Sequence, residues 1–443
     1  MKNKFLLTLT FSFLFTFVTF AQNLNKSKLD SLFSILAEKD KSMVSVAISK
    51  NGSVLYQKAI GFASISDQGN VPATVDTRYR IGSITKMFTA VMIFQLVEEG
   101  KLTLATPLAK YFPSVPNADK ITIGNLLNHR SGIHNFTSNP GIMQYMIQPK
   151  TQEEMVEFIS KSPSDFEPDT KTNYSNSNFV LLGYIVEKIT GKKYADNLNQ
   201  RIVSKLQLKN TYYGTKTDLK KNESYSYKQN EKWVQQPETD MSVPAGAGAI
   251  VSTPADLNLF ITGLFVGKLI STTNLNQMKT IQDGLGMGMI QIPFSTKKGY
   301  GHNGGIDGFV SDLYYFQEDD LAVAICSNGT TYPTNDILLA LLSSYYNVPF
   351  AIPTFKTISL KSEDLDKYVG IYSSTMMPLK ITVSKNGSEL NAQATGQGAF
   401  PLSATETDTF VFNATGIVMV FNPSKNEFIL KQGPGNYLFT KEK

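Results

Sequence analysis

The sequence has little cysteine and little histidine. Its 443 residues include one cysteine, Cys326, and three histidines, His129, His134 and His302. A single cysteine excludes an intrachain disulfide, and because Cys326 lies in the apolar run "LAVAICSNG" we interpret it as a buried structural thiol. The histidines occur in no H-E-x-x-H pattern and in no paired cysteine–histidine spacing. We therefore expect neither a metal site nor another cofactor.

An excess of charge of one sign is also missing. The net charge at pH 7 is +5, and no basic run with interleaved aromatic residues occurs. We therefore expect no nucleic-acid partner. The length and the 42% hydrophobic content suffice for a large core and for more than one domain.

Long hydrophobic runs are confined to the N-terminus. A basic start, "MKNK", precedes the uncharged, mostly apolar run "FLLTLTFSFLFTFVTF" and the small residue Ala21. This order is typical of a secretory signal peptide, so we predict that residues 1–21 are cleaved and that the protein is periplasmic or secreted. The alternative is an uncleaved anchor, although a run of about 16 residues is short for a membrane span. The sequence gives no indication of the oligomeric state.

The remaining chain predicts two domains. An amphipathic helix at residues 23–40 precedes two strands around an Asn51–Gly52 turn, and strands return from about residue 285 after a helix-rich and loop-rich middle. We predict an α+β fold over residues 22–350, in which both ends meet in one antiparallel sheet flanked by helices, with a helical insert. Residues 351–443 change to short alternating runs with frequent turn signals, which predicts a small all-β, barrel-like domain.

One apolar run contains a serine and a lysine three residues apart. "RIGSITKMF" holds Ser83 and Lys86, which would share one face of a helix. The spacing alone is weak, since "STKK" repeats it at Ser295 and Lys298, and Ser83 could simply cap a helix that keeps Lys86 in water. Lys86 has apolar neighbours, however, and burial lowers a lysine pKa toward neutrality, which would let its amine activate the serine. We therefore treat the two residues as a candidate nucleophile and base.

Two further motifs carry polar groups that could serve such a nucleophile. "NYSNSNF" places Tyr174 and Asn176 in Y-x-N spacing just before a helix, where both side chains can face one cleft; the same spacing recurs by chance at Tyr345. "YGHNGGIDGF" places His302 in H-x-G spacing on a glycine-rich predicted strand. Glycine at such positions lets the backbone approach a ligand closely.

As an ordered set, S-x-x-K, Y-x-N and H-x-G resemble the penicillin-recognising serine hydrolases. The resemblance is to the class C β-lactamase-like branch, which includes D-alanyl-D-alanine carboxypeptidases, D-aminopeptidases and esterases. It extends over roughly residues 28–347 and includes the stretches "LLNHRSGI" and "AGAGAIVSTPADLNLF". The tail resembles, less specifically, a small β-barrel that follows some of these hydrolases.

The resemblance implies a mechanism and a role for each motif residue. Ser83 would attack a carbonyl and form an acyl-enzyme, and Lys86 and Tyr174 would share the general-base and general-acid work, in an order that the sequence leaves open. The N–H groups of Ser83 and Gly305 would form the oxyanion hole. The other implied site residues are His302 in the catalytic set and, for substrate binding, Asn176, Asn303 and Gly304.

The third motif departs from the pattern of many relatives. It reads His302-Asn303-Gly304 where they have a lysine and a threonine. Histidine is mostly neutral at pH 7, so it is not the fixed cation that suits a terminal carboxylate. We therefore predict a serine hydrolase acting on a small peptide, amide or ester, with cell-wall-derived D-amino-acid peptides among the candidates and the scissile bond left open.

Two alternative functions stay open at this point. A non-catalytic relative could bind penicillins or peptidoglycan fragments as a sensor, or the β-rich tail could act as a carbohydrate or lipid binder. For the remaining polar residues, we expect His129 to shape the loop of "LLNHRSGI". We interpret His134 and Arg130 as loop or surface residues, with Arg130 as a remote candidate for contact with a substrate carboxylate.

Overall fold

The computed structural model describes residues 24–377, 379–412, 417–432 and 435–442. The predicted signal peptide, residues 1–21, lies outside this part of the chain. Within the described ranges, every helix is too short or too polar to cross a membrane.

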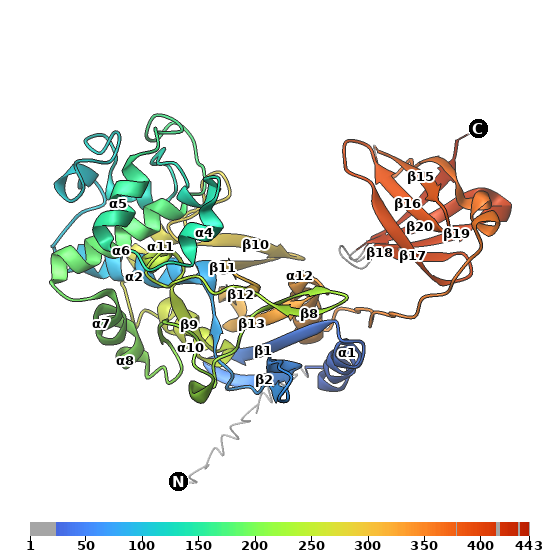
Figure 1. Ribbon diagram of the computed structural model, residues 1–443, viewed down its shortest axis with the longest axis horizontal. Coiled ribbons are helices and arrows are strands. Elements are labelled where there is room, and N and C mark those ends of the chain that lie inside the picture. Colours follow the sequence, from blue (N-terminus) through green and yellow to red (C-terminus); the bar gives the residue numbers. More distant parts are fainter. Residues whose placement is uncertain (1–23, 378, 413–416, 433–434, 443) are drawn as a thin grey trace, which may run out of the picture.

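A six-stranded antiparallel sheet joins the two ends of the first predicted domain (Figure 1). Its strands, in spatial order, are β10 (Ile290–Phe294), β11 (Lys297–Ile306), β12 (Phe309–Phe316), β13 (Leu321–Thr330), β1 (Ser42–Lys50) and β2 (Ser53–Ile60). The Asn51–Gly52 turn connects β1 to β2, and β1 pairs along its other edge with β13. The predicted meeting of N-terminal and C-terminal strands in one antiparallel sheet is thus confirmed.

Helices cover both faces of this sheet. Successive residues of a strand point to opposite faces, and in β12 Tyr314 packs with α1 (Lys26–Glu38) and α12 (Thr334–Tyr345). Its neighbour Leu313 belongs to the larger core formed with α2 (Thr85–Glu98), α6 (Asn176–Thr190) and α10 (Pro254–Phe265). The α2 helix is buried from Thr85 to Leu96, as its apolar sequence predicts.

The helical insert and its short strands lie between β2 and β10 in the sequence. Its further helices are α3 (Ile123–Leu127), α4 (Ile142–Met146), α5 (Gln152–Ser160), α7 (Tyr194–Leu198), α8 (Ser204–Leu206), α9 (Ala245–Gly248) and α11 (Thr272–Met278). Its short strands are β3 (Phe62–Ser64), β4 (Val71–Pro72), β5 (Tyr79–Arg80), β6 (Tyr212–Tyr213), β7 (Tyr227–Asn230), β8 (Lys232–Gln235) and β9 (Ile250–Ser252). Because β9 pairs with both β5 and β6, it anchors the chain immediately before Ser83.

The C-terminal strands close into an eight-stranded barrel (Figure 1), which confirms the predicted barrel-like domain. The strands are β14 (Gly370–Ser373), β15 (Lys380–Asn386), β16 (Glu389–Ala394), β17 (Phe400–Glu406), β18 (Thr409–Phe412), β19 (Ile417–Asn422), β20 (Glu427–Gln432) and β21 (Gly435–Lys441). Buried side chains such as Tyr372, Phe410 and Phe428 fill the interior, which is therefore a packed core. Residues 348–361 connect the two units without helix or strand, and the predicted boundary at residue 350 falls in this segment.

The single cysteine is part of the main core. Cys326 lies in β13, is fully buried and carries a free thiol. Burial raises the pKa of this thiol, which keeps it protonated and unreactive. This environment agrees with the structural role expected from the sequence.

Candidate active site

Ser83 lies on a tight turn in front of α2. The turn, η1 (Gly82–Ile84), is a short 3-10 helix that begins with Gly82 at a φ of +50°, in the left-handed region that favours glycine. The hydroxyl of Ser83 caps neither η1 nor α2. It instead faces Lys86, whose Nζ lies 3.0 Å from Ser83 Oγ. The helix-cap alternative considered for this serine is therefore wrong.

Lys86 is fully buried, with three oxygen atoms around its amine. Besides Ser83 Oγ, these are Asn176 Oδ1 at 2.8 Å and the carbonyl oxygen of Ala247 at 2.9 Å. None of the three belongs to a carboxylate, so no opposite charge compensates for the loss of water. Burial accordingly holds the pKa of Lys86 well below its ordinary value of 10.5.

Asn176 is oriented by the loop that precedes α4. Its Nδ2 donates to Thr137 Oγ1 at 3.1 Å and to Asn135 Oδ1 at 3.3 Å, and its backbone N–H donates to the same Asn135 oxygen at 3.0 Å. Because both amide hydrogens face these acceptors, the Oδ1 atom is turned toward Lys86. The loop thus fixes Asn176 as a hydrogen-bond acceptor for the buried amine.

Tyr174 is a second hydrogen-bond partner of Ser83. Its hydroxyl donates to Ser83 Oγ at 2.9 Å, and Lys86 Nζ lies 4.9 Å from the centre of its ring. Burial raises the pKa of the phenol above its ordinary value of 10, while the hydrogen bond with Ser83 acts in the opposite direction. Tyr174 is therefore a protonated donor at neutral pH.

His302 lies in β11, near the ring of Tyr174, and is buried. Its ring centre is 6.2 Å from that of Tyr174, and its Nδ1–H donates to the carbonyl oxygen of Asn303 at 2.5 Å. Burial, together with the nearby charge of Lys86, lowers the pKa of His302 to about 4. The imidazole is thus neutral at pH 7 and does not replace the lysine cation that many relatives have in this motif.

Like His302, the other two residues of this motif are not among those that line the cavity next to Ser83. Asn303 is exposed and pairs in register with Asp312 of β12. Gly304 is buried against the carbonyl oxygen of Ile81 and the hydroxyl of Ser311, where a Cβ atom would not fit. Their roles in substrate binding stay predictions.

Gly305 and Ser83 line the same cavity, which has a volume of about 540 Å³. β10 pairs with β11 only as far as Gly301, so the rest of this edge is free to approach η1. A Cβ atom built on Gly82 would lie 2.8 Å from the nitrogen of Gly305, which shows how closely the two backbones pack. Much of the cavity wall is apolar and includes Phe136, Met143, Met146, Pro244, Ile306 and Phe309.

Arg130 is occupied by ion pairs and is not available as a carboxylate receptor. Its guanidinium bonds to Asp169 Oδ1 at 2.6 Å and to Asp283 Oδ2 at 3.1 Å. The contact with Asp169 joins the loop after α3 to the loop that leads into Tyr174, and the contact with Asp283 joins it to the segment between α11 and β10. His134 is partly exposed and contacts Asp165 Oδ1 at 2.8 Å, in agreement with a loop role.

The chance repeat of the serine–lysine spacing lies elsewhere. Ser295 and Lys298 are both exposed, at the turn between β10 and β11 and on the first residues of β11. Burial of the lysine therefore separates the two S-x-x-K sites, as their surroundings in the sequence predict.

The sequence interpretation missed several groups that hold the site. Ala247 contributes only a backbone carbonyl, which has no side-chain signature, although it lies within the quoted glycine-rich stretch. Asn135 and Thr137 lie two and four residues after the end of "LLNHRSGI", and this proximity was the available signal. Among the described residues, no group of three or more histidine, cysteine, aspartate or glutamate side chains is placed to hold a metal ion.

The sequence and the fold both match a known protein family. The sequence profile described as Beta-lactamase matches residues 30–343. The teichoic acid D-alanine hydrolase of Staphylococcus aureus is 27% identical over 307 residues, which are 66% of this chain and 74% of the relative.

Solved structures agree with this assignment. The D-amino acid amidase from Ochrobactrum anthropi SV3, complexed with D-phenylalanine, is 28% identical with a TM-score of 0.65 and covers 73% of this chain and 99% of its own. The octameric penicillin-binding protein homologue from Pyrococcus abyssi shares the fold over 94% of this chain and all of its own, with a TM-score of 0.66 at 24% identity. The chain therefore belongs to the beta-lactamase family and is a serine hydrolase.

Proposed function

We propose that the protein hydrolyses amide or ester bonds of D-amino-acid derivatives through an acyl-enzyme on Ser83. The observation that carries the proposal is the position of Ser83 Oγ, 3.0 Å from Lys86 Nζ and 2.9 Å from Tyr174 Oη. Activation of a serine requires a base within hydrogen-bond reach and a means to protonate the leaving group. Lys86 and Tyr174, which both contact Ser83 Oγ and can both carry a proton, meet these two requirements.

The partners of Lys86 favour it as the base. Asn176 Oδ1 and the carbonyl of Ala247 can only accept hydrogen bonds. A neutral amine has two hydrogens and one lone pair, so when both hydrogens point to these acceptors the lone pair faces Ser83 Oγ. Burial lowers the pKa of Lys86, which favours this neutral state. We assign Lys86 as the group that removes the proton of Ser83.

Tyr174 then suits the role of proton relay. Its raised pKa keeps the proton on the phenol until a stronger base forms at the reacting centre. As Ser83 Oγ bonds to the substrate carbonyl carbon, its proton moves to Lys86. When the bond to the leaving nitrogen or oxygen breaks, Tyr174 protonates the leaving group and regains a proton from Lys86. Water then attacks the acyl-enzyme by the reverse proton path and releases the acid.

The negative charge on the substrate oxygen needs donors in the same cavity. We assign the backbone N–H groups of Ser83 and Gly305 to this oxyanion hole because both residues line the cavity and their segments pack closely. A single donor of this kind typically contributes about 100- to 1000-fold in kcat.

The cavity favours uncharged, partly apolar substrates. Of the residues that line its described part, Lys228 and Asp307 carry charge. Asp307 is held by Arg80 and Thr239, and Lys228 is exposed on β7. A neutral His302 likewise offers no charge to a terminal carboxylate. We therefore expect amides and esters with neutral or acylated amines to be better substrates than peptides with a free terminal carboxylate.

The relatives support the D-configuration. They are named for D-amino acid amides and for the D-alanine of teichoic acid. Such substrates lie outside the cytoplasm when they are part of the cell envelope, and the N-terminal signal pattern is in keeping with a periplasmic or secreted enzyme.

The proposal is tested with a substrate panel offered to the wild type and to Ser83→Ala. The panel contains D- and L-phenylalanine amide, a D-alanine ester, a D-alanyl-D-alanine peptide, a p-nitrophenyl ester and a chromogenic β-lactam. We expect turnover of the D-amides or esters, loss of that turnover in Ser83→Ala, and an acyl adduct on Ser83 detected by mass spectrometry. Ser295→Ala is the matched control, since it removes the exposed serine of the chance repeat.

Other results would favour the alternatives. Stable Ser83-dependent labelling by a fluorescent penicillin without turnover of any substrate would indicate a sensor. Absence of both labelling and turnover would contradict the assignment of Ser83 as the nucleophile.

A further inference from the structure

A buried arginine lies directly before the catalytic turn. Arg80 is 3% exposed and is the last residue of β5. One of its terminal nitrogens donates to the carbonyl oxygen of Thr239 at 2.8 Å and to Asp307 Oδ2 at 3.0 Å. The other donates to Glu238 Oε2 at 2.7 Å and to the carbonyl oxygen of Thr215 at 3.1 Å. The guanidinium is thus fixed by four acceptors.

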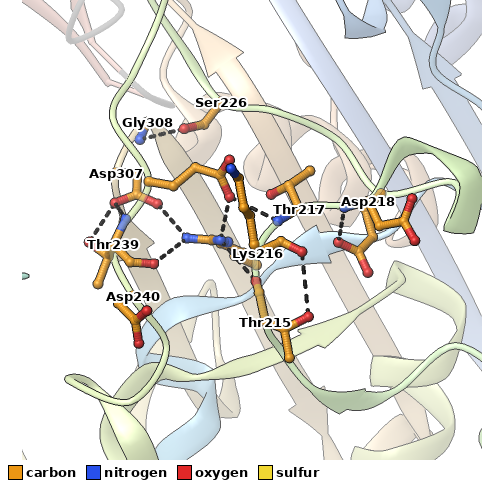
Figure 2. A network of polar contacts seen from close by, with 12 residues as sticks. Thr215, Lys216, Thr217, Asp218, Ser226, Thr239, Asp240, Asp307 and Gly308 are labelled. Carbon is orange, nitrogen blue, oxygen red and sulfur yellow. Dashed lines mark hydrogen bonds and ion pairs between the residues drawn. The ribbon is translucent and has the colours of Figure 1, made fainter. Parts of the chain in front are cut away.

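Asp307 is the more deeply buried of the two carboxylates that contact Arg80. Its side chain is 2% exposed, and its second oxygen, Oδ1, accepts from the backbone N–H of Thr239 at 3.1 Å and from the Thr239 hydroxyl at 2.7 Å. Figure 2 shows Asp307 and Thr239 on one side of the network and Thr217 and Asp218 on the other. Both carboxylate oxygens of Asp307 are therefore bound.

The position of this pair relates it to the reaction. Arg80 is three residues before Ser83, and Asp307 is two residues after Gly305, in the turn between β11 and β12. The turn has a second anchor, since the N–H of Gly308 donates to Ser226 Oγ at 3.0 Å (Figure 2). The ion pair thus joins the two backbone segments to which we assign the oxyanion hole.

We infer that Arg80 and Asp307 are positioning residues that set the separation of the Ser83 and Gly305 N–H groups. The inference rests on the proposed function, because it concerns the oxyanion hole of that reaction. Both terminal nitrogens of Arg80 and both oxygens of Asp307 are already hydrogen-bonded within the protein, so the pair acts through the backbone. A buried ion pair is weak evidence for stability, and its directional hydrogen bonds are better suited to fixing geometry.

Arg80→Lys and Asp307→Asn test the inference. Lysine keeps the charge but lacks the planar fork that reaches four acceptors, and asparagine keeps the size of Asp307 without its charge. We expect kcat to fall about 10- to 100-fold, less than the loss of one whole oxyanion donor, with KM within about threefold of the wild type. Because the two residues act on the same contact, the double variant is expected to lose no more than the worse single variant.

Two further measurements separate positioning from a general structural role. A boronic acid that forms a tetrahedral adduct with Ser83 is expected to bind more weakly by the same factor as kcat falls, while a non-covalent reaction product binds as in the wild type. Arg201→Lys is the matched control, since Arg201 pairs with Glu99 away from the site. It is expected to keep the wild-type kcat.

A milder variant covers the case in which the charge variants fail to fold. Thr239→Val removes one hydrogen bond to Asp307 and leaves the ion pair in place. It is expected to lower kcat and boronate affinity together, by a few-fold. If the wild type turns over substrate and the folded variants keep the wild-type kcat and boronate affinity, the inference is wrong. If the wild type forms no acyl adduct on Ser83, the proposed function is wrong instead.

Discussion

His129 stacks on Tyr174, with ring centres 4.5 Å apart and planes inclined by 27°. Its Nδ1 accepts a hydrogen bond from the backbone N–H of Ser175 at 3.1 Å, and its carbonyl accepts from the N–H of Asn173 at 2.9 Å. Burial and the nearby charge of Lys86 hold the pKa of His129 well below its ordinary value. His129 is therefore a neutral support for the residues on both sides of Tyr174.

Replacement of His129 is expected to disturb Tyr174 without removing it. His129 has a φ of +59°, and asparagine tolerates this region, so His129→Asn removes the stacking with little added backbone strain. A stacked aromatic pair contributes about 0.5–1.5 kcal/mol beyond its buried area, which predicts a fall in kcat of about 2- to 13-fold. Steady-state kinetics measure this effect, and His134→Asn in the neighbouring loop is the control. An unchanged kcat would show that Tyr174 needs no such support.

Asn176→Asp is expected to shift the pH dependence of turnover. The new carboxylate would lie about where Asn176 Oδ1 lies, 2.8 Å from Lys86 Nζ. An opposite charge at that distance raises a lysine pKa, and a base must be neutral to accept a proton. The acid limb of kcat/KM is therefore expected to move to higher pH.

The matched control for this change is Asn173→Asp. Asn173 is exposed on the loop just before α6, so the variant adds the same charge without contact to Lys86. We expect its acid limb to match that of the wild type. If the acid limb of kcat/KM lies at the same pH in Asn176→Asp as in the wild type, Lys86 is not the titrating base.

Much of the fold could be predicted because its signals are local. The Asn51–Gly52 turn and the apolar run of α2 each determine one element through a few adjacent residues. The closed barrel follows from alternating strands at short, regular intervals, although its register does not.

The site was less predictable because its supporting contacts join distant segments. Arg130 meets Asp169 and Asp283, which are 39 and 153 residues away, so its pairing could not be deduced from its neighbours. Ala247 acts through its backbone, which a sequence motif does not display. Arg80 stands inside the quoted motif, yet only its distant partner Asp307 gives it a role.

The buried His302 is expected to make stability depend on pH. Its pKa is about 4 in the folded protein against an ordinary value of 6.5, so the unfolded chain takes up the proton first as the pH falls. The contribution of His302 to the free energy of unfolding is thus present above pH 6.5 and is lost as the pH falls toward 4. Between pH 7 and pH 5 it lowers the free energy of unfolding by about 2 kcal/mol.

His302→Gln removes this dependence. Urea unfolding at pH 5 and pH 7 is expected to show a smaller loss of stability in the variant, by about 2 kcal/mol, whatever its stability at pH 7. Between pH 7 and pH 8 the curves of variant and wild type are expected to run parallel, because His302 is then neutral in both states. Equal losses between pH 7 and pH 5 would contradict a neutral, buried imidazole.

The barrel is expected to be dispensable for the chemistry. The two hydrophobic clusters of the first unit include no residue beyond Phe355, and the barrel core is a separate cluster that begins at Leu360. A chain that stops after residue 361 is therefore expected to fold and to keep the turnover of small esters. Loss of ester turnover in a folded truncated protein would indicate that the barrel helps to form the site.

Gly82 gives a separate test of the contact between the catalytic turn and β11. Gly82→Ala adds a methyl group that would lie 2.8 Å from the nitrogen and 2.9 Å from the carbonyl oxygen of Gly305, and a backbone cannot yield as a flexible side chain can. Gly100 has a similar positive φ, +68°, but no atom within 4 Å of an added Cβ, so Gly100→Ala carries the same backbone strain without the clash. Such strain costs about 1–2 kcal/mol at either position.

We expect both variants to have a lower Tm. Only Gly82→Ala is expected to lose at least about 100-fold in kcat, because the clash separates the two oxyanion donors. Equal kinetics in the two variants would mean that the packing of Gly82 on Gly305 does not control the geometry at Ser83.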